Sequence, residues 1–151
     1  MKTVIQEIAD KSAEQVIIAC TEVTQEIRNL QAHAESVGNS IAADLDGKQV
    51  NVSLDDILYF EAVDEQVFVY LASDVGRVRG RLYEYEERLS DRGFVRVSKS
   101  VLLHLRMVRN ISPALGRKFI AELTNGEQVI ISRQYIKTVR EILLGGKINA
   151  F

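Results

Sequence analysis

The chain has 151 residues, of which 46% are hydrophobic and 26% charged, a composition that suits one folded core and excludes a disordered or collagen-like protein. Its single cysteine, Cys20, excludes an internal disulfide, and the absence of a long apolar run excludes a membrane span or signal peptide and predicts a cytoplasmic protein. The formal net charge of −2 is unevenly distributed along the chain. Residues 77–118 form a basic segment that contains eleven Lys and Arg and four Asp and Glu.

Short strands are predicted wherever apolar alternation or β-branched runs end at turn residues. They are expected at about 3–8, 15–20, 40–45, 49–53, 57–62, 66–72, 76–81, 117–123 and 127–132. Three residue pairs that favour tight turns predict hairpins between them: Asp46-Gly47, Asp64-Glu65 and Asn125-Gly126. The sequence therefore predicts a chain that is mostly β-strand.

Helical spacing appears three times, at about 22–37, 82–93 and 133–146. Thr21 is expected to cap the first helix and Gly38 to end it, whereas Ser132 is expected to cap the last. The apolar stripe of the first helix suits packing on a sheet, which we favour, or a short coiled-coil dimer. The change from helical spacing to alternation divides the chain into a strand and helix extension, residues 1–41, and a main domain, residues 42–151.

Residues suited to catalysis are few. His33 lies inside the first helix, and His104 lies in an apolar run, where a buried side chain satisfied by the backbone is favoured over a catalytic base. The sequence holds no metal-ligand spacing and no glycine-rich phosphate loop. We therefore expect no enzyme activity, no cofactor, no metal and no small-molecule substrate.

Four basic stretches are expected at strand ends or turns, where side chains can reach a DNA groove. They are Arg79-Gly-Arg81, residues 94–100, Gly116-Arg-Lys118 and residues 131–135. Among them, the hydroxyls of Ser98, Ser100 and Ser132 suit phosphate binding. An equally weighted alternative is that Arg96 and Arg133 pair with acidic neighbours and that Ser132 only caps a helix.

Motifs in a consistent order cover roughly residues 42–145 and resemble the LytTR DNA-binding domain of bacterial transcriptional regulators. They are Ile57-Leu-Tyr-Phe-Glu61, Val67-Phe-Val-Tyr70, Leu82-Tyr-Glu-Tyr-Glu-Glu-Arg-Leu89, Phe94-Val-Arg-Val-Ser-Lys-Ser100, Val108 to Ile111, and Leu123-Thr-Asn-Gly126 followed by Ile131-Ser-Arg-Gln-Tyr135. The resemblance implies an α+β fold, mostly β: an elongated antiparallel structure whose loops, rather than a helix, enter successive major grooves.

The resemblance also implies a role for individual residues. Lys99, in the central loop, and Arg133, before the last helix, match the family's base-reading positions, and Gln66 is the candidate in the hairpin after Glu61. Contacts with the DNA backbone are expected from Arg96, Ser100, Arg117 and Lys137. His104 stands where the family usually has asparagine, a departure expected to concern folding.

The extension of about 40 residues is too short for the receiver domain that many family members carry. It resembles the extension of stand-alone regulators, some of which a membrane protein inhibits, and is expected to mediate dimerisation or inhibitor binding. We therefore expect a homodimer that reads paired sites in double-stranded DNA. The alternative is a protein-interaction adaptor or antagonist on the same scaffold, which pairing of Arg96, Lys99 and Arg133 with carboxylates would favour.

Overall fold

The computed structural model describes residues 1–145, and the chain divides into two compact units, Met1–Asn39 and Ser40–Phe151. The first unit contains helix α1, Gln25–Ser36, and a short 3-10 helix, Lys11–Ala13. The Oγ1 atom of Thr24 accepts a hydrogen bond from the backbone N–H of Ile27 at 3.3 Å. Thr24 is therefore the cap, and the expectation that Thr21 caps this helix is wrong.

The strands predicted at residues 3–8 and 15–20 do not form. An alternating segment becomes a strand only when another strand supplies hydrogen-bond partners, and the first unit contains no strand among its described residues. Helix α1 buries no residue, so the partner of its apolar stripe stays a prediction. No helix within residues 1–145 is long and apolar enough to cross a membrane.

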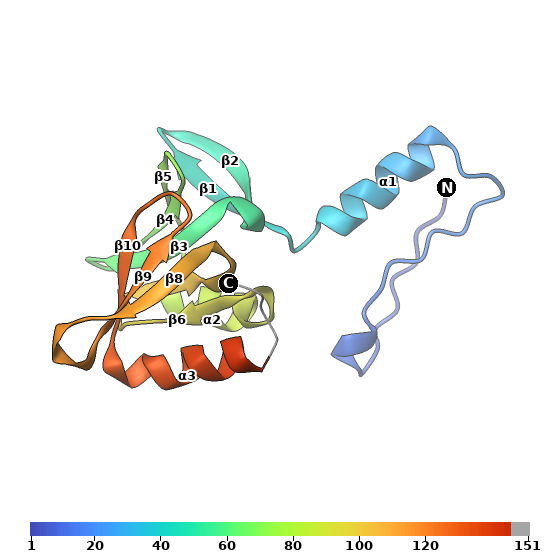
Figure 1. The fold of residues 1–151 in the computed structure, drawn as a ribbon. Helices are drawn as coiled ribbons and strands as arrows, with labels where there is room; N and C mark the ends of the chain where they lie inside the picture. The colour runs from blue at the N-terminus through green and yellow to red at the C-terminus, as the bar shows by residue number, and fades with distance from the viewer. Residues whose placement is uncertain (146–151) are drawn as a thin grey trace. The chain divides into compact units, whose positions relative to one another are not determined.

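The second unit contains two antiparallel sheets (Figure 1). The larger has the strand order β2-β1-β5-β4-β3-β7-β6 and the smaller the order β10-β9-β8. The strands are β1 Ser40–Leu45, β2 Lys48–Ser53, β3 Ile57–Val63, β4 Gln66–Leu71, β5 Val75–Val78, β6 Phe94–Arg96, β7 Val101–His104, β8 Val108–Pro113, β9 Phe119–Leu123 and β10 Gln128–Ile131. The predicted α+β class, mostly β, is confirmed.

The three predicted hairpins are confirmed, since β1 pairs with β2, β3 with β4, and β9 with β10. In the β3–β4 turn, both Asp64 and Glu65 have positive φ angles, 49° and 65°. Such turns match the right-handed twist of the flanking strands. The turn thus places Val63 opposite Gln66, which fixes where the hairpin tip lies in the sheet.

Helices α2, Leu82–Leu89, and α3, Arg133–Leu144, complete the second unit. Helix α2 packs Leu82, Tyr85 and Leu89 into a core with strands of the larger sheet. Helix α3 contributes Val139 to a second core, which holds residues of β7 and the smaller sheet. A groove lined by residues of α2, β6 and α3 runs between the two helices.

His104 has the structural role that the sequence predicts. Its side chain is 2% exposed, its Nδ1 atom lies 2.9 Å from the carbonyl oxygen of Ile57, and its ring stacks on Phe94. Burial lowers the pKa of His104 below its ordinary value, which favours the neutral imidazole. His104 therefore holds β7 to the start of β3 as a neutral side chain.

Candidate nucleic-acid interface

Three loops of the second unit meet at one end of the sheets. The loop of residues 97–100 joins β6 to β7, and the carbonyl of Val97 accepts a hydrogen bond of 2.8 Å from the backbone N–H of Ser132, just before α3. The loop of residues 114–118 joins β8 to β9, and Phe119 at its end pairs with Ile131. Backbone hydrogen bonds thus bring together segments that are more than 30 residues apart in the sequence.

The three loops enclose a cleft of about 500 Å³, called the loop cleft below. Its lining includes Ser98, Lys99, Ser100, Lys118, Ser132 and Arg133. No carboxylate is part of the lining among residues 1–145, and the three cations form no ion pair within 4 Å with any residue in that range. The loop cleft therefore presents positive charge and hydroxyl groups without an acidic partner.

Lys99 projects from a loop that backbone contacts hold tightly. The N–H of Val97 bonds to the carbonyl of Val101 at 3.0 Å, closing the turn, and the N–H of Ala62 on β3 bonds to the carbonyl of Ser100 at 2.8 Å. Inside the turn, the Ser98 hydroxyl accepts a hydrogen bond from the N–H of Ser100 at 3.3 Å. The exposed Lys99 side chain thus extends from an ordered base.

Arg96 lies behind this loop rather than in the cleft lining. Its Nη1 atom donates to the carbonyl oxygen of Lys99 at 2.6 Å, and its Nη2 atom lies 3.2 Å from Glu86 Oε1 on α2. The Arg96 side chain is only 17% exposed. Of the two alternatives set out from the sequence, Arg96 therefore has the acidic partner, whereas Arg133 has none among residues 1–145.

Helix α3 begins at the loop cleft. Ser132 holds the N-cap position, yet its hydroxyl makes no capping hydrogen bond, and the first turn contains no acidic residue. The unsatisfied N–H groups at the start of a helix favour a negatively charged partner. Ser132 is thus the N-cap residue that the sequence predicts, without a capping hydrogen bond from its side chain, and it also lines the loop cleft.

The other residues expected to contact DNA lie outside the lining of the loop cleft. Gln66 is exposed on the β3–β4 hairpin, where its Oε1 atom accepts a hydrogen bond from Arg77 Nη1 at 3.3 Å. Arg117 is exposed in the β8–β9 loop, and Lys137 is exposed one turn beyond Arg133 on α3. None of these three side chains is part of the cleft lining.

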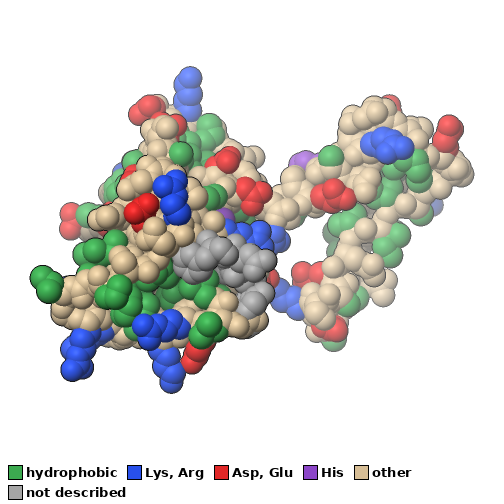
Figure 2. Space-filling model, viewed as in Figure 1, with side chains coloured by type: hydrophobic (Ala, Val, Ile, Leu, Met, Phe, Trp, Pro, Cys, Tyr) green, Lys and Arg blue, Asp and Glu red, His purple; other side chains and the backbone are tan. Residues whose placement is uncertain are grey.

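The lining includes two polar side chains that the sequence placed in the basic stretches but did not single out as contacts, Lys118 and Gln134. Both adjoin a chosen residue, since Lys118 follows Arg117 and Gln134 follows Arg133. Which of two neighbours faces a cleft depends on the local turn, and the positive φ of Arg117 at 61° sets that turn here. Figure 2 shows Lys and Arg side chains projecting along the edge that α3 and the β8–β9 loop form in Figure 1.

Comparison with known proteins gives consistent matches that include the second unit. A family described as the LytTr DNA-binding domain matches residues 47–144. The chain is 26% identical over 122 residues to the sensory transduction protein LytT of Bacillus anthracis, covering 81% of this chain and 49% of that protein. It is 27% identical over 92 residues to the LytT protein of Enterococcus faecalis, covering 61% and 38%. The chain thus spans half the length, or less, of these curated relatives.

A solved structure shares the fold. It is described as the LytTr DNA-binding domain of a putative methyl-accepting/DNA response regulator from Bacillus cereus. The two superpose with a TM-score of 0.65 at 24% sequence identity, covering 70% of this chain and 96% of the other. The arrangement of sheets and helices in the second unit is therefore one that a known domain also adopts.

Proposed function

The chain belongs to the LytTr DNA-binding domain family, and we propose that it is a transcriptional regulator whose loops read specific sequences in double-stranded DNA. The observation that carries the proposal is the loop cleft, where Lys99, Lys118 and Arg133 converge without a carboxylate in the lining among residues 1–145. Phosphate neutralisation requires such unpaired cations, and guanine O6 and N7 accept hydrogen bonds from Lys and Arg.

The residues divide into two roles in this proposal. Lys99 and Arg133 read bases in the major groove, because each projects from a loop or helix start that backbone bonds hold in place. The surrounding groups contact phosphates and position the protein without reading sequence. They are Ser98, Ser100, Arg117, Lys118, Ser132 and Lys137.

Arg96 acts through Lys99 in this proposal. Its bond to the Lys99 carbonyl and its ion pair with Glu86 hold the loop of residues 97–100 against α2. A half-buried guanidinium with two partners has little freedom to reach a phosphate. Arg96 is therefore a positioning residue rather than a contact with the DNA backbone.

Gln66 extends the reading surface from the neighbouring hairpin. The β3–β4 turn lies beside the loop of residues 97–100, because Ala62 on β3 bonds to Ser100. A glutamine amide can contact an adenine edge, whereas the adjacent Asp64 and Glu65 carry the wrong charge for a phosphate. Those two exposed carboxylates favour the second candidate function, a protein-interaction adaptor that uses this hairpin.

The extension supplies dimerisation in the proposed regulator. Helix α1 has an apolar stripe and buries no residue, so a second copy of α1 is a suitable partner, with a membrane-protein inhibitor as the alternative occupant. A symmetric dimer would read paired sites.

The test is selection of bound sequences from a random duplex pool, with a Lys99→Ala/Arg133→Ala variant as the control. Enrichment of a paired motif by the wild-type protein, lost in the variant, is the expected result. If folded wild-type protein enriches no sequence at low salt, the proposed function is wrong and the adaptor is favoured.

A further inference from the structure

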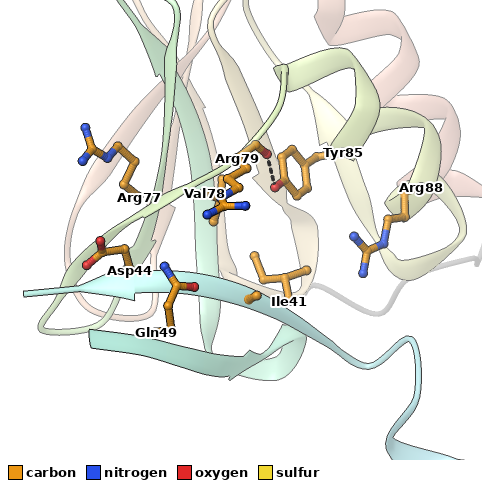
Figure 3. Close-up of a pocket in the computed structure, with 9 residues that line it drawn as sticks. Ile41, Asp44, Gln49, Arg77, Val78, Arg79, Tyr85 and Arg88 are labelled. Atoms are coloured by element: carbon orange, nitrogen blue, oxygen red, sulfur yellow. Dashed lines mark hydrogen bonds between the residues drawn. The ribbon is translucent and has the colours of Figure 1, made fainter. Parts of the chain in front are cut away.

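A second basic cleft, of about 570 Å³, lies between β1, β5 and α2; we call it the β5 cleft (Figure 3). Strands β1 and β5 are paired at Asp44 and Arg77, and the cleft opens beyond that pair. Figure 3 shows the side chains of Arg79 and Arg88 on either side of Ile41. Arginine side chains from the β5 segment and from α2 thus line the same cleft.

The charge in the β5 cleft is positive. Arg77, Arg79 and Arg88 line it with a single carboxylate, that of Asp44. None of these arginines forms an ion pair within 4 Å with a residue of the described range 1–145. The lining therefore carries three cations and one carboxylate, an excess of positive charge.

The sheet register places this cleft at the same end of the molecule as the Lys99 loop. One row across four neighbouring strands consists of Ser100, Ala62, Val67 and Val78. One residue beyond this row, toward the end of the sheet that carries the β3–β4 turn, the chain has Lys99, Gln66 and Arg79. Three strand spacings of about 4.8 Å separate the first strand from the last, so Arg79 starts about 14 Å from Lys99, with Gln66 between them.

Local contacts hold the backbone of Arg79 in place. The Tyr85 hydroxyl of α2 donates a hydrogen bond to the Arg79 carbonyl. Gly80 follows with a φ of 93°, and a Cβ atom there would meet the Glu84 carboxylate at 2.6 Å. The positive φ favours glycine in the turn into α2, and the Tyr85 bond holds the Arg79 backbone beside this turn, where its side chain lines the cleft.

We propose that the β5 cleft binds the DNA sugar-phosphate backbone on the flank of the site, through Arg79 and Arg88. The proposal rests on the proposed function and extends its footprint. One phosphate per strand occurs every 3.4 Å along the duplex axis, so 14 Å corresponds to about four base pairs. Arg77, which donates to Gln66, links the reading hairpin to this flank contact.

The experiment measures binding of the full chain to a duplex of about 40 base pairs that carries the sequence enriched by selection, and to a scrambled duplex. The variant is Arg79→Ala/Arg88→Ala. Arg106→Ala is the matched control, since Arg106 is exposed beyond the opposite end of β7. Each lost phosphate contact lowers the salt slope by about 0.9.

The expected result is that the double variant binds more weakly to both duplexes, by equal factors. Its deficit should be roughly twelvefold larger at 50 mM than at 200 mM salt, because two contacts are lost. Arg79→Lys/Arg88→Lys, which keeps the charges, should retain the wild-type slope. Because a dimer on paired sites has two flanks, trimming the duplex at both ends to the enriched sequence should abolish the difference between wild type and variant.

The outcomes distinguish failure of the flank contact from failure of the proposed function. If the folded double variant has the same salt slope as Arg106→Ala, or if its deficit survives trimming of both ends, the flank contact is wrong while sequence-specific binding stands. If the wild-type protein binds the selected and scrambled duplexes equally, the proposed function is wrong, and the flank proposal that rests on it is overturned as well.

Discussion

Substitution of Glu86 by Gln tests whether Arg96 positions the reading loop, because two physical effects predict opposite changes in DNA affinity. Removing a carboxylate near a DNA-binding surface should by itself tighten binding to any DNA. Removing the partner of Arg96 should loosen the contact between Arg96 and the Lys99 carbonyl and weaken specific binding. The sign of the change therefore separates the two effects.

The magnitude follows from the contacts. The ion pair spans 3.2 Å, with Arg96 17% exposed and Glu86 40% exposed, so solvent screening limits its contribution to about 1 kcal/mol. A loss of about 1 kcal/mol corresponds to a roughly fivefold weaker affinity for the selected duplex. Binding to scrambled DNA should be unchanged or slightly tighter, since it does not depend on the position of Lys99.

The assay is fluorescence anisotropy with labelled selected and scrambled duplexes, with Glu87→Gln as the matched control. Glu87 is the next residue on α2, is exposed, and forms no ion pair within 4 Å with residues 1–145. Exchange of the hydrogen-bonded amides of Val97 and Ser100 without DNA gives an independent readout and should accelerate only in Glu86→Gln. Equal tightening of binding by both substitutions, with unchanged exchange, would refute the positioning role.

Three further predictions concern the reading residues, the buried histidine and the extension. Lys99→Ala or Arg133→Ala should each cost about 1–3 kcal/mol of affinity for the selected duplex and little for scrambled DNA; equal losses on both would make them phosphate contacts. Burial lowers the pKa of His104 in the folded chain, so the unfolded chain binds the proton more readily, and the free energy of unfolding should fall as the pH drops below 6.5. Urea unfolding at several pH values should show that the free energy of unfolding falls less with decreasing pH in His104→Asn than in the wild type. An equal fall in both proteins would assign the pH dependence to other groups. Ile27→Asp/Leu30→Asp should convert a dimer to a monomer in light scattering, and an unchanged mass of folded protein would exclude α1 as the dimer contact.

Local sequence determined much of the second unit. The pairs Asp46-Gly47 and Asp64-Glu65 tolerate positive φ angles, and the chain turns there as predicted. The alternating segments on either side became β1 to β4, because each had a neighbour a few residues away. The family motifs, read from the sequence, likewise agree with the fold.

Other elements depended on partners that are distant in the sequence. The alternation at residues 3–8 and 15–20 predicted strands that do not form, whereas β6, β7 and β8 were not predicted. Strand β7 is buried at every position and shows no alternation, so its apolar run carried no signal for a strand. Whether such segments pair is decided by neighbours that become available only in the folded sheet.

In the loop cleft, too, some features were predictable from the sequence and others depended on the tertiary structure. Charge and turn signals predicted the basic stretches that contain Lys99 and Arg133, the family resemblance selected these two residues as base readers, and both line one cleft. The bond from Ser132 to Val97, the choice of Lys118 at the cleft, and the burial of Arg96 against Glu86 required the tertiary structure. Turn propensity acts over a few residues, whereas hydrogen-bond partners and burial join segments far apart in the chain, so the sequence alone identified the cations and only the fold decided which of them stay unpaired.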